Sequence, residues 1–315
     1  MPPVLSRLFL LACAALATGA AAQQPSTVAI TRIDLGHGLY MLRGQGGNIG
    51  VSVGSDGVIL IDDQFAPLTP AIEAAIREVS DAPIRFVLNT HWHGDHTGGN
   101  ENLGKSGAVI VAHHGVRRRM AAGGRMEAFG REVPPAPPAA LPVVTFGKDL
   151  QLHLNGLRLV AHHVAAAHTD GDAYVWWPEA KVLHAGDLYF NGFYPVIDWG
   201  SGGHIDGMIA AVDRILATVD DETRIIPGHG PLSDRKGLQA YRDMLADVAA
   251  RIHALLDAGK SVEEVVAARP TAAWDEKWGK GFLAPDAWVE MVARGILRHA
   301  SASRPQQGDP AAHRH

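Results

Sequence analysis

Residues 84–89 form a short apolar run that leads directly into the sequence His-Trp-His-Gly-Asp-His at 91–96. β-Prone apolar residues in such a run predict a buried strand. Polar side chains at the carboxyl end of a strand lie where α/β folds place their sites. An interpretation as ordinary loop residues accounts for one or two histidines, but not for four ligand-type residues in six positions.

The spacing within this segment predicts two directions for its side chains. His91 and His93 are two residues apart, so on an extended backbone they point to the same side. Asp95 and His96 follow Gly94. We expect the backbone to turn at this glycine, because it lacks a side chain, and to aim the second pair at a different point. One turn can therefore supply ligands to two metal ions.

His-x-His-x-Asp-His after a strand resembles the signature of the metallo-β-lactamase superfamily. Three further motifs follow in the order that this resemblance implies: Ala-His-Thr-Asp with His168, Ala-Gly-Asp with Asp187, and Pro-Gly-His with His229. The resemblance covers about residues 27–232 directly. It implies an α/β fold, a four-layer αβ/βα sandwich, with added C-terminal helices.

The resemblance also implies a role for each ligand. A first metal ion is held by His91, His93 and His168, a second by Asp95, His96 and His229, and Asp187 bridges the two. Imidazole and carboxylate ligands suit two zinc ions, and also iron or manganese. Two metals that share a water activate it for hydrolysis. We therefore expect a hydrolase of ester, lactone or lactam bonds, with Asp95 and Asp187 as catalytic carboxylates.

Departures from family patterns narrow the substrate. The β-lactamase subclass with a cysteine ligand has that cysteine where this chain has Asp187, and a lysine where it has Phe190. A bridging aspartate is more typical of thioesterases resembling glyoxalase II, lactonases, tRNA-processing nucleases and phosphodiesterases. The alternatives to ester or lactone hydrolysis are a β-lactamase proper, a non-hydrolytic periplasmic metal-binding or relay protein, and an iron-dependent oxidase on the same scaffold.

The first 22 residues predict export. Arg7 precedes an apolar core at 8–16, and Ala20 to Ala22 end the segment, which is typical of a signal peptide. We expect a secreted, periplasmic protein with a folded domain at 23–300 and a disordered tail at 301–315. The apolar core is too short to span a bilayer, and no later stretch is apolar enough. A lipoprotein site at Cys13 is the weaker interpretation of this segment.

The charge and the cysteine content argue against a nucleic-acid partner and against thiolate metal ligands. Removal of Arg7 leaves 27 basic against 33 acidic residues, a net charge of −6. An acidic surface argues against nucleic acid and for a small-molecule substrate. Cys13 is the only cysteine, so a mature chain has no thiolate ligand. The sequence leaves the oligomeric state open.

The loop at 188–204 is rich in aromatic residues and glycine and follows Asp187 directly. It either forms a pocket wall or packs onto outer helices. Tyr194 in this loop is a candidate catalytic residue, because tyrosine donates to the oxyanion in the related lactonases. Residues 189–199 contain no lysine or arginine, which favours neutral esters or lactones over carboxylate-bearing β-lactams.

Other polar groups have two interpretations each. Asp62 either holds a ligand histidine or faces solvent in a turn. The arginines at 117–119 form a solvated face or an anion site. We expect His162 and His163 to be structural. Apolar patterns predict strands at 58–63, 108–112, 150–154, 157–161, 173–177, 182–185 and 224–226, and helices at 69–79, 208–219 and 238–256.

Overall fold

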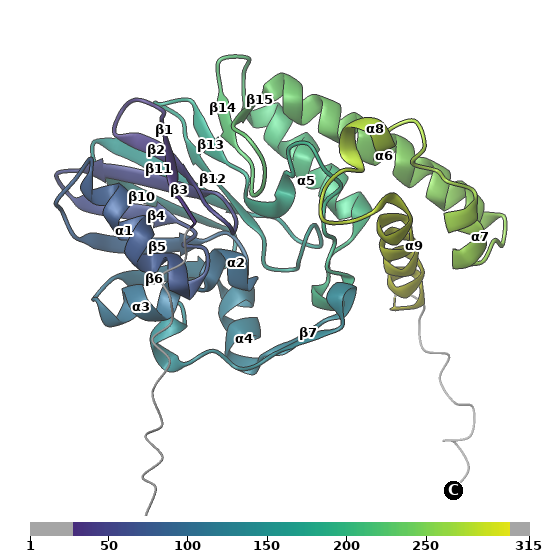
Figure 1. Cartoon of the computed structure of the whole chain (residues 1–315), viewed down its shortest axis with the longest axis horizontal. Helices are drawn as coiled ribbons and strands as arrows, with labels where there is room; N and C mark the ends of the chain where they lie inside the picture. The colour runs from purple at the N-terminus through teal and green to yellow at the C-terminus, as the bar shows by residue number, and fades with distance from the viewer. Residues whose placement is uncertain (1–27, 303–315) are drawn as a thin grey trace, which may run out of the picture.

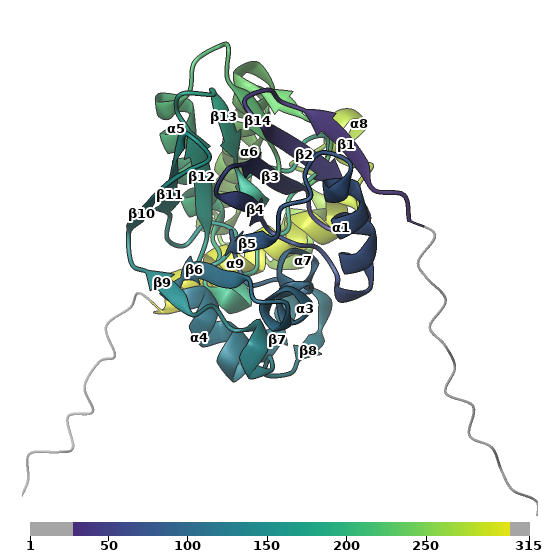
Figure 2. The same ribbon diagram turned by 90° about the vertical axis from the view of Figure 1, so that its left-hand side faces the viewer.

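The computed structural model describes residues 28–302, so the predicted signal peptide at 1–22 lies outside the described residues. Two β-sheets pack face to face, and helices cover their outer surfaces (Figure 1; Figure 2). This arrangement confirms the predicted four-layer αβ/βα sandwich. The last helix, α9, continues to Ala302, two residues into the predicted tail, because its apolar face packs on the domain; residues from 303 lie outside the described range.

The first sheet has seven strands in the order β1-β2-β3-β4-β5-β6-β9. Neighbours from β1 to β4 are antiparallel, and those from β4 to β9 are parallel. A tight turn at residues 55–56 joins β3 to β4 in a hairpin. The strands are Thr31–Asp34, Leu39–Arg43, Ile49–Gly54, Gly57–Ile61, Ile84–Asn89, Val109–His113 and Val144–Phe146.

The second sheet has six strands in the order β10-β11-β12-β13-β14-β15, and only β13 and β14 pair in parallel. Edge strand β10 alternates between exposed polar residues and half-buried leucines, as a strand with one face on a core does. The strands are Asp149–Leu154, Leu157–His163, Ala173–Trp177, Val182–His184, Arg224–Ile226 and Ser233–Asp234. A separate hairpin pairs β7 (Gly124–Met126) with β8 (Arg131–Val133).

Helices α1, α3 and α4 pack on the first sheet, and α5 and α6 pack on the second (Figure 1). The long helix α6 buries residues at helical spacing, including Leu238, Tyr241 and Leu245, so one face packs inward. The α-helices α1 to α9 are Thr69–Arg77, Gly94–Thr97, Asn100–Lys105, His114–Ala122, Ile205–Thr218, Arg235–Asp257, Val262–Ala267, Asp275–Trp278 and Pro285–Ala302.

Apolar cores lie between the two sheets and behind each of them. Between the sheets, Ile61 and Leu88 meet Val175 of the opposite sheet. Behind the second sheet, α5, α6 and α9 enclose a larger core that contains Trp278 and Trp288. Each fully buried apolar side chain of this size contributes about 1.5–3 kcal/mol. The C-terminal helices are therefore an integral part of the domain.

This topology brings several strand ends to one edge of the sandwich. The carboxyl ends of β5 in the first sheet and of β13 and β14 in the second lead into the predicted ligand motifs. Loops at the carboxyl ends of parallel strands are the usual place for an α/β site. Among the helices of residues 28–302, none combines the length and apolar character needed to cross a bilayer.

Candidate metal centre

The first four predicted ligands follow β5. His91 and His93 lie on non-helical backbone, and His93 caps helix α2, which carries Asp95 and His96. Gly94 does not adopt a left-handed conformation, and a Cβ there would meet nothing within 4 Å. The expectation that glycine redirects the chain is therefore wrong. The helical turn itself gives the second pair its different direction.

The structure brings all seven predicted ligands together. His168 lies between β11 and β12, Asp187 follows β13, and His229 follows β14. Within each of two groups the potential ligand atoms lie within 4.8 Å of one another; the groups are His91, His93, His168 and Asp187, and Asp95, His96 and His229. We call these seven residues the metal cluster. It is able to hold metal ions.

Asp187 lies between the two groups. Its Oδ2 is 3.4 Å from His168 Nε2 and 3.7 Å from His91 Nε2. Its Oδ1 is 3.1 Å from His96 Nε2 and 3.5 Å from His229 Nε2. Each carboxylate oxygen therefore faces one group, which is the arrangement of a bridging ligand.

Two ligand histidines are oriented through Asp62. His96 Nδ1 donates to Asp62 Oδ2 at 2.7 Å. His91 Nδ1 lies 3.0 Å from Thr90 Oγ1, and this hydroxyl in turn donates to Asp62 at 2.8 Å. Asp62 is fully buried. It therefore holds ligands and does not face solvent, and it leaves both Nε2 atoms directed at the cluster.

The loop at 188–204 orients the other two buried ligand histidines, His93 and His168. His93 Nε2 lies 3.0 Å from Asp198 Oδ2, which leaves Nδ1 for the cluster. His168 Nδ1 donates to the Val196 carbonyl at 2.6 Å, which directs Nε2 into the cluster, 2.9 Å from His93 Nδ1. Held rings of this kind increase metal affinity, because the ligand atoms are already in place.

Orphaned polar atoms show that the residues fit metal ions. His91 Nε2 and Asp187 Oδ1 are buried without a hydrogen bond of acceptable geometry. Buried polar atoms are normally paired, and unpaired ones cost about 1–3 kcal/mol. Imidazole nitrogen and carboxylate oxygen at one point are a donor set for first-row metal ions, which would satisfy both atoms.

Electrostatics prepares most of these groups for ligation. Burial lowers the pKa of His168 to about 4 and, with neighbouring histidines, lowers that of His91. Burial alone would raise the pKa of Asp187, but His96, His229 and His91 outweigh it and hold this pKa well below its usual value. Asp187 and Asp95 outweigh the effect of burial on His229 and raise its pKa to about 9. A metal ion must displace that proton.

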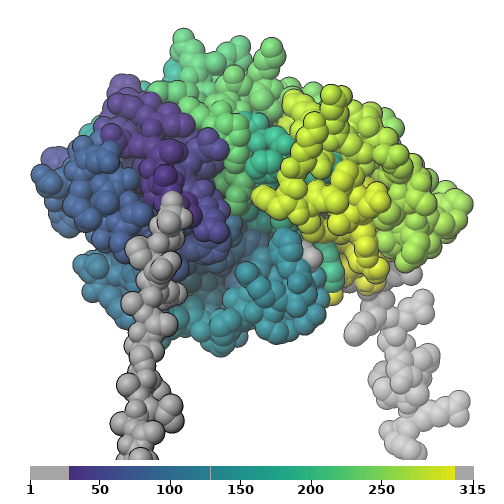
Figure 3. Space-filling view, in the orientation of Figure 1, coloured from purple at the N-terminus to yellow at the C-terminus, as the bar shows by residue number. Residues whose placement is uncertain are grey.

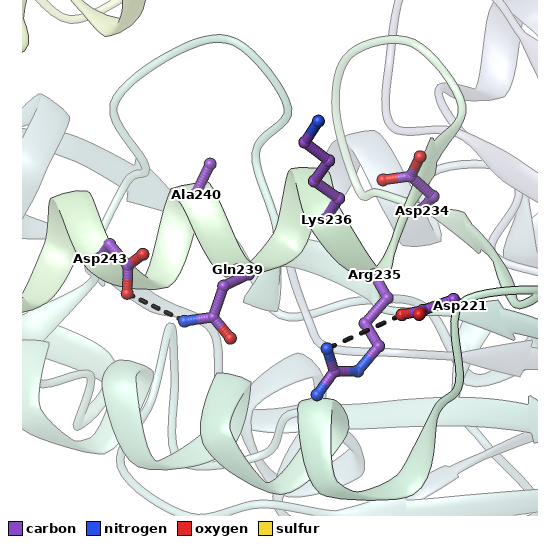
Figure 4. Close-up of a pocket in the computed structure, with 7 residues that line it drawn as sticks. All are labelled: Asp221, Asp234, Arg235, Lys236, Gln239, Ala240 and Asp243. Carbon is purple, nitrogen blue, oxygen red and sulfur yellow. Dashed lines mark hydrogen bonds and ion pairs between the residues drawn. The ribbon is translucent and has the colours of Figure 1, made fainter.

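A cavity of about 250 Å³ opens onto the metal cluster. It is lined by Gln45, His93, Asp95, Phe129, His168, Asp187, Phe190, Val196, His229 and Phe282. A larger cavity of about 630 Å³ lies at the start of α6 (Figure 4). In its lining Arg235 pairs with Asp221 at 3.8 Å and Gln239 donates to Asp243 at 2.9 Å, and no residue of the metal cluster belongs to it. The smaller cavity is therefore the candidate site.

The structure does not bring Tyr194 to the metal cluster. Tyr194 is buried, its ring stacks on Trp288 at 4.3 Å, and its hydroxyl donates to Asp275 Oδ1 at 2.9 Å. The expected oxyanion contact is therefore not formed, because the C-terminal helices bind this side chain. From the predicted wall at 188–204, only Phe190 and Val196 line the cavity.

The remaining predicted groups have structural partners. Arg119 pairs with Asp170 at 2.6 Å, and Arg117 binds the Pro142 carbonyl, so these arginines neither line the cavity nor form a fully solvated face. His162 binds Asp149 at 2.7 Å. Neither His162 nor His163 belongs to the metal cluster, as predicted.

Sequence reasoning missed four residues of the site. Asp198 lies 105 positions from the histidine that it orients, and nothing local distinguishes it from other loop aspartates. Gln45, Phe129 and Phe282 line the cavity but belong to no motif. Gln45 sits in a glycine-rich loop, and a Cβ at Gly47 would overlap the His96 ring. The glycines at 44, 46 and 47 are the one sequence signal that could have indicated Gln45.

Comparison with known proteins agrees with this geometry. The profile of the metallo-beta-lactamase superfamily matches residues 42–229. A hydroxyacylglutathione hydrolase of Polaromonas sp. is 31% identical over 166 residues, 52% of this chain and 55% of that relative. A type 2 metallo-beta-lactamase of Bacteroides fragilis is 24% identical over 189 residues, 56% of this chain and 70% of the relative. The chain thus spans about half the length of the first relative.

Solved structures show the same fold. A stereoselective inverting sec-alkylsulfatase from Pseudomonas sp. superposes with a TM-score of 0.65 and 19% identity, over 85% of this chain and 50% of that one. A metallo-beta-lactamase from Pontibacter korlensis gives a TM-score of 0.58 and 20% identity, over 70% and 99%. Because the family profile covers more than half of the sequence, this chain belongs to the metallo-β-lactamase superfamily.

Proposed function

We propose that this chain is a hydrolase that binds two metal ions, zinc foremost, and cleaves an ester, lactone or lactam bond in a small molecule. The observation that carries the proposal is the position of Asp187, whose two carboxylate oxygens face one ligand group each. Relatives named as hydrolases support it. Iron or manganese also fits nitrogen and carboxylate ligands.

The chain's own residues position the ligand atoms and supply an ionised carboxylate to the cavity. Asp62 and Asp198 fix the rings of their histidines, so that the ligand atoms need no rearrangement. Metal ions bound there would polarise a scissile carbonyl group and lower the pKa of a water molecule. Asp95 lines the cavity, and His96 and His229 overcome burial to keep its pKa below the usual value. Its carboxylate is therefore ionised, as a metal ligand must be.

The cavity lining supports an uncharged small-molecule substrate. It contains Asp95 and Asp187 but neither lysine nor arginine. A substrate carboxylate would therefore have no cationic side chain to pair with in the lining, which favours neutral esters or lactones over β-lactams. Nucleic acid, which calls for basic surface, does not fit this lining.

The test combines metal analysis with turnover. Chelated protein is reconstituted with zinc, iron or manganese and assayed with a neutral ester, a lactone, a penicillin and a hydroxyacylglutathione thioester. We expect about two metal ions per chain, no turnover after chelation, and faster cleavage of the lactone than of the penicillin. Fully loaded protein that hydrolyses none of the four would favour a metal-binding or relay role.

We also propose export to the periplasm, because residues 1–22 have the pattern of a signal peptide. Fractionation of cells that produce the full chain, beside a variant that lacks residues 2–22, tests this. Equal retention of both proteins in the cytoplasm would contradict it.

A further inference from the structure

Two exposed phenylalanines flank the cavity. The large apolar side chains that are exposed among the described residues are Phe129, Val143, Val144, Phe282 and Leu297. Of these, Phe129 and Phe282 line the cavity above the metal cluster, with 49% and 55% of their surface accessible. Exposed apolar side chains that gather at a cavity mark a binding surface, whereas scattered ones do not.

The two phenylalanines come from opposite sides of the mouth. Phe129 ends a short 3₁₀ helix, Glu127–Phe129, at the tip of the β7–β8 hairpin. Phe282 lies in the segment between α8 and α9, beyond the residues that the family profile matches. In the space-filling view, the teal hairpin and the yellow C-terminal segment face each other across a recess (Figure 3).

Phe282 is held against the metal cluster. Its ring lies 5.3 Å from that of Phe193, 5.9 Å from that of Phe190 and 5.6 Å from that of His229. Its neighbour Gly281 leaves no room for a Cβ, which would lie 2.3 Å from Phe193 Cβ. The segment therefore packs closely on the loop that follows Asp187.

The hairpin that carries Phe129 is also supported. Arg125 bridges its two strands by pairing with Glu132 at 2.8 Å. A Cβ at Gly200 would lie 2.8 Å from Glu127 Cγ, so the tip rests on the loop that contains Asp198. Phe129 is thus positioned by contacts across the site.

The size and charge of the cavity decide what meets these rings. At about 250 Å³ it is smaller than the roughly 300–1,000 Å³ of sites that enclose a drug-sized ligand. A longer substrate must therefore extend into the mouth, between Phe129 and Phe282. The lining has two carboxylates, Asp95 and Asp187, and neither lysine nor arginine, and Phe129 and Phe282 at the mouth are apolar, so the part of the substrate that lies there is apolar and uncharged.

We infer that Phe129 and Phe282 form an apolar clamp that selects neutral esters with an aliphatic acyl chain of medium length. This inference rests on the proposed hydrolase function and names its substrate class. The metal cluster acts on the carbonyl group at the cavity floor, while the acyl chain lies between the two rings. Burial of each additional methylene then favours the longer ester.

The test uses a series of 4-nitrophenyl esters from acetate to octanoate with zinc-reconstituted protein. We expect the wild type to show a kcat/KM about tenfold higher for octanoate than for acetate. Phe129→Ala and Phe282→Ala should each lower the octanoate value by about 5-fold to 10-fold, mainly through KM, and lower the acetate value by less. Phe282→Leu should restore most of the loss. Leu297→Ala, an exposed residue outside the lining, is the matched control.

Metal content and a binding measurement separate the clamp from the catalytic centre. Each variant should retain the zinc content of the wild type. In metal-free protein, ligand-observed NMR should show tighter binding of 2-decanone than of 2-butanone, and the alanine variants should lose that difference. Equal turnover of acetate and octanoate by the wild type, or equal losses on both esters in the variants, would overturn the clamp. Loaded protein that hydrolyses neither these esters nor the lactone, the penicillin and the thioester would refute the hydrolase function, while the ketone titration still decides the clamp.

Discussion

Among residues 28–302, histidine rings lie close together in several places, and the metal cluster differs from the others in its ability to hold metal ions. The metal cluster has five histidines around Asp187. A second group, which we call the histidine trio, consists of His113, His114 and His163. His113 stacks on His163 with centroids 3.6 Å apart and rings 6° from parallel, and lies 4.0 Å from His114.

The difference lies in where the ring nitrogens point. In the trio, His113 Nδ1 accepts from the Gly115 amide at 3.2 Å, and His163 Nδ1 donates to the Asp172 carbonyl at 2.9 Å. Among the residues that the structure describes, ligand atoms converge only in the metal cluster. In a ligand histidine of a metal site, one ring nitrogen must therefore be hydrogen-bonded to a supporting group, and the other must point toward the shared carboxylate. Proximity of the rings is not sufficient.

The largest expected effect comes from the shared carboxylate. Asp187→Asn should lower turnover by at least about 100-fold and weaken one metal site, because a neutral amide cannot bridge two cations. Elemental analysis and steady-state kinetics measure the two losses, and circular dichroism should stay unchanged. Full metal content with activity like that of the wild type would show that Asp187 is not the bridge.

The second largest effect is expected at Asp198, which orients the ring of the ligand His93. Asp198→Asn should weaken metal affinity by about 10-fold to 100-fold, since it removes the carboxylate partner of His93. Chelator competition measures the affinity. Asp213→Asn, which alters an aspartate paired with Arg242, serves as the control. Equal affinities for both variants would mean that the His93 ring needs no such support.

Substitutions in the histidine trio should change the stability of the protein and leave its metal content unchanged. His113→Ala should lower the free energy of unfolding by about 2 kcal/mol, because it removes the cap of α4 and a buried ring. His113→Asn keeps a capping acceptor and should recover about 1 kcal/mol. Denaturant unfolding measures both values. A loss of bound zinc in either variant would contradict the comparison.

The trio also predicts a dependence on pH. Burial, and then His163 and His114, lower the pKa of His113 to about 4, against about 6.5 in an unfolded chain. Between these values the unfolded chain binds more protons, so this contribution to stability is full above pH 6.5 and is lost as the pH falls toward 4. After removal of metal with a chelator, the Tm of the wild type should fall more between pH 7 and pH 5 than the Tm of the His113→Asn variant. Parallel losses would remove His113 as the source.

The smallest effect on activity is expected at Tyr194. Its hydroxyl is bound to Asp275, so Tyr194→Phe should leave kcat within about twofold and lower the free energy of unfolding by about 1 kcal/mol. Steady-state kinetics and thermal unfolding separate the two effects. A tenfold or larger loss of turnover at unchanged stability would return this hydroxyl to the site.

Much of the fold could be predicted because its signals are local. Strands β5, β12 and β14 match their predicted ranges, since each is an apolar run between turns. Helix α5 begins at Ile205, three residues before the predicted start, because the His204 ring caps it, and that cap depends on a side chain outside the apolar pattern.

The sequence by itself indicated the ligand set, because the density of ligand-type residues at 91–96 marked the first four and the resemblance to a known family marked His168, Asp187 and His229. Only the tertiary structure decided the rest of the site. Asp198 contacts His93, Tyr194 contacts Asp275, and Phe129 and Phe282 line the same cavity, so that distant segments come together. Such contacts depend on how sheets and helices pack, so no local pattern of residues encodes them.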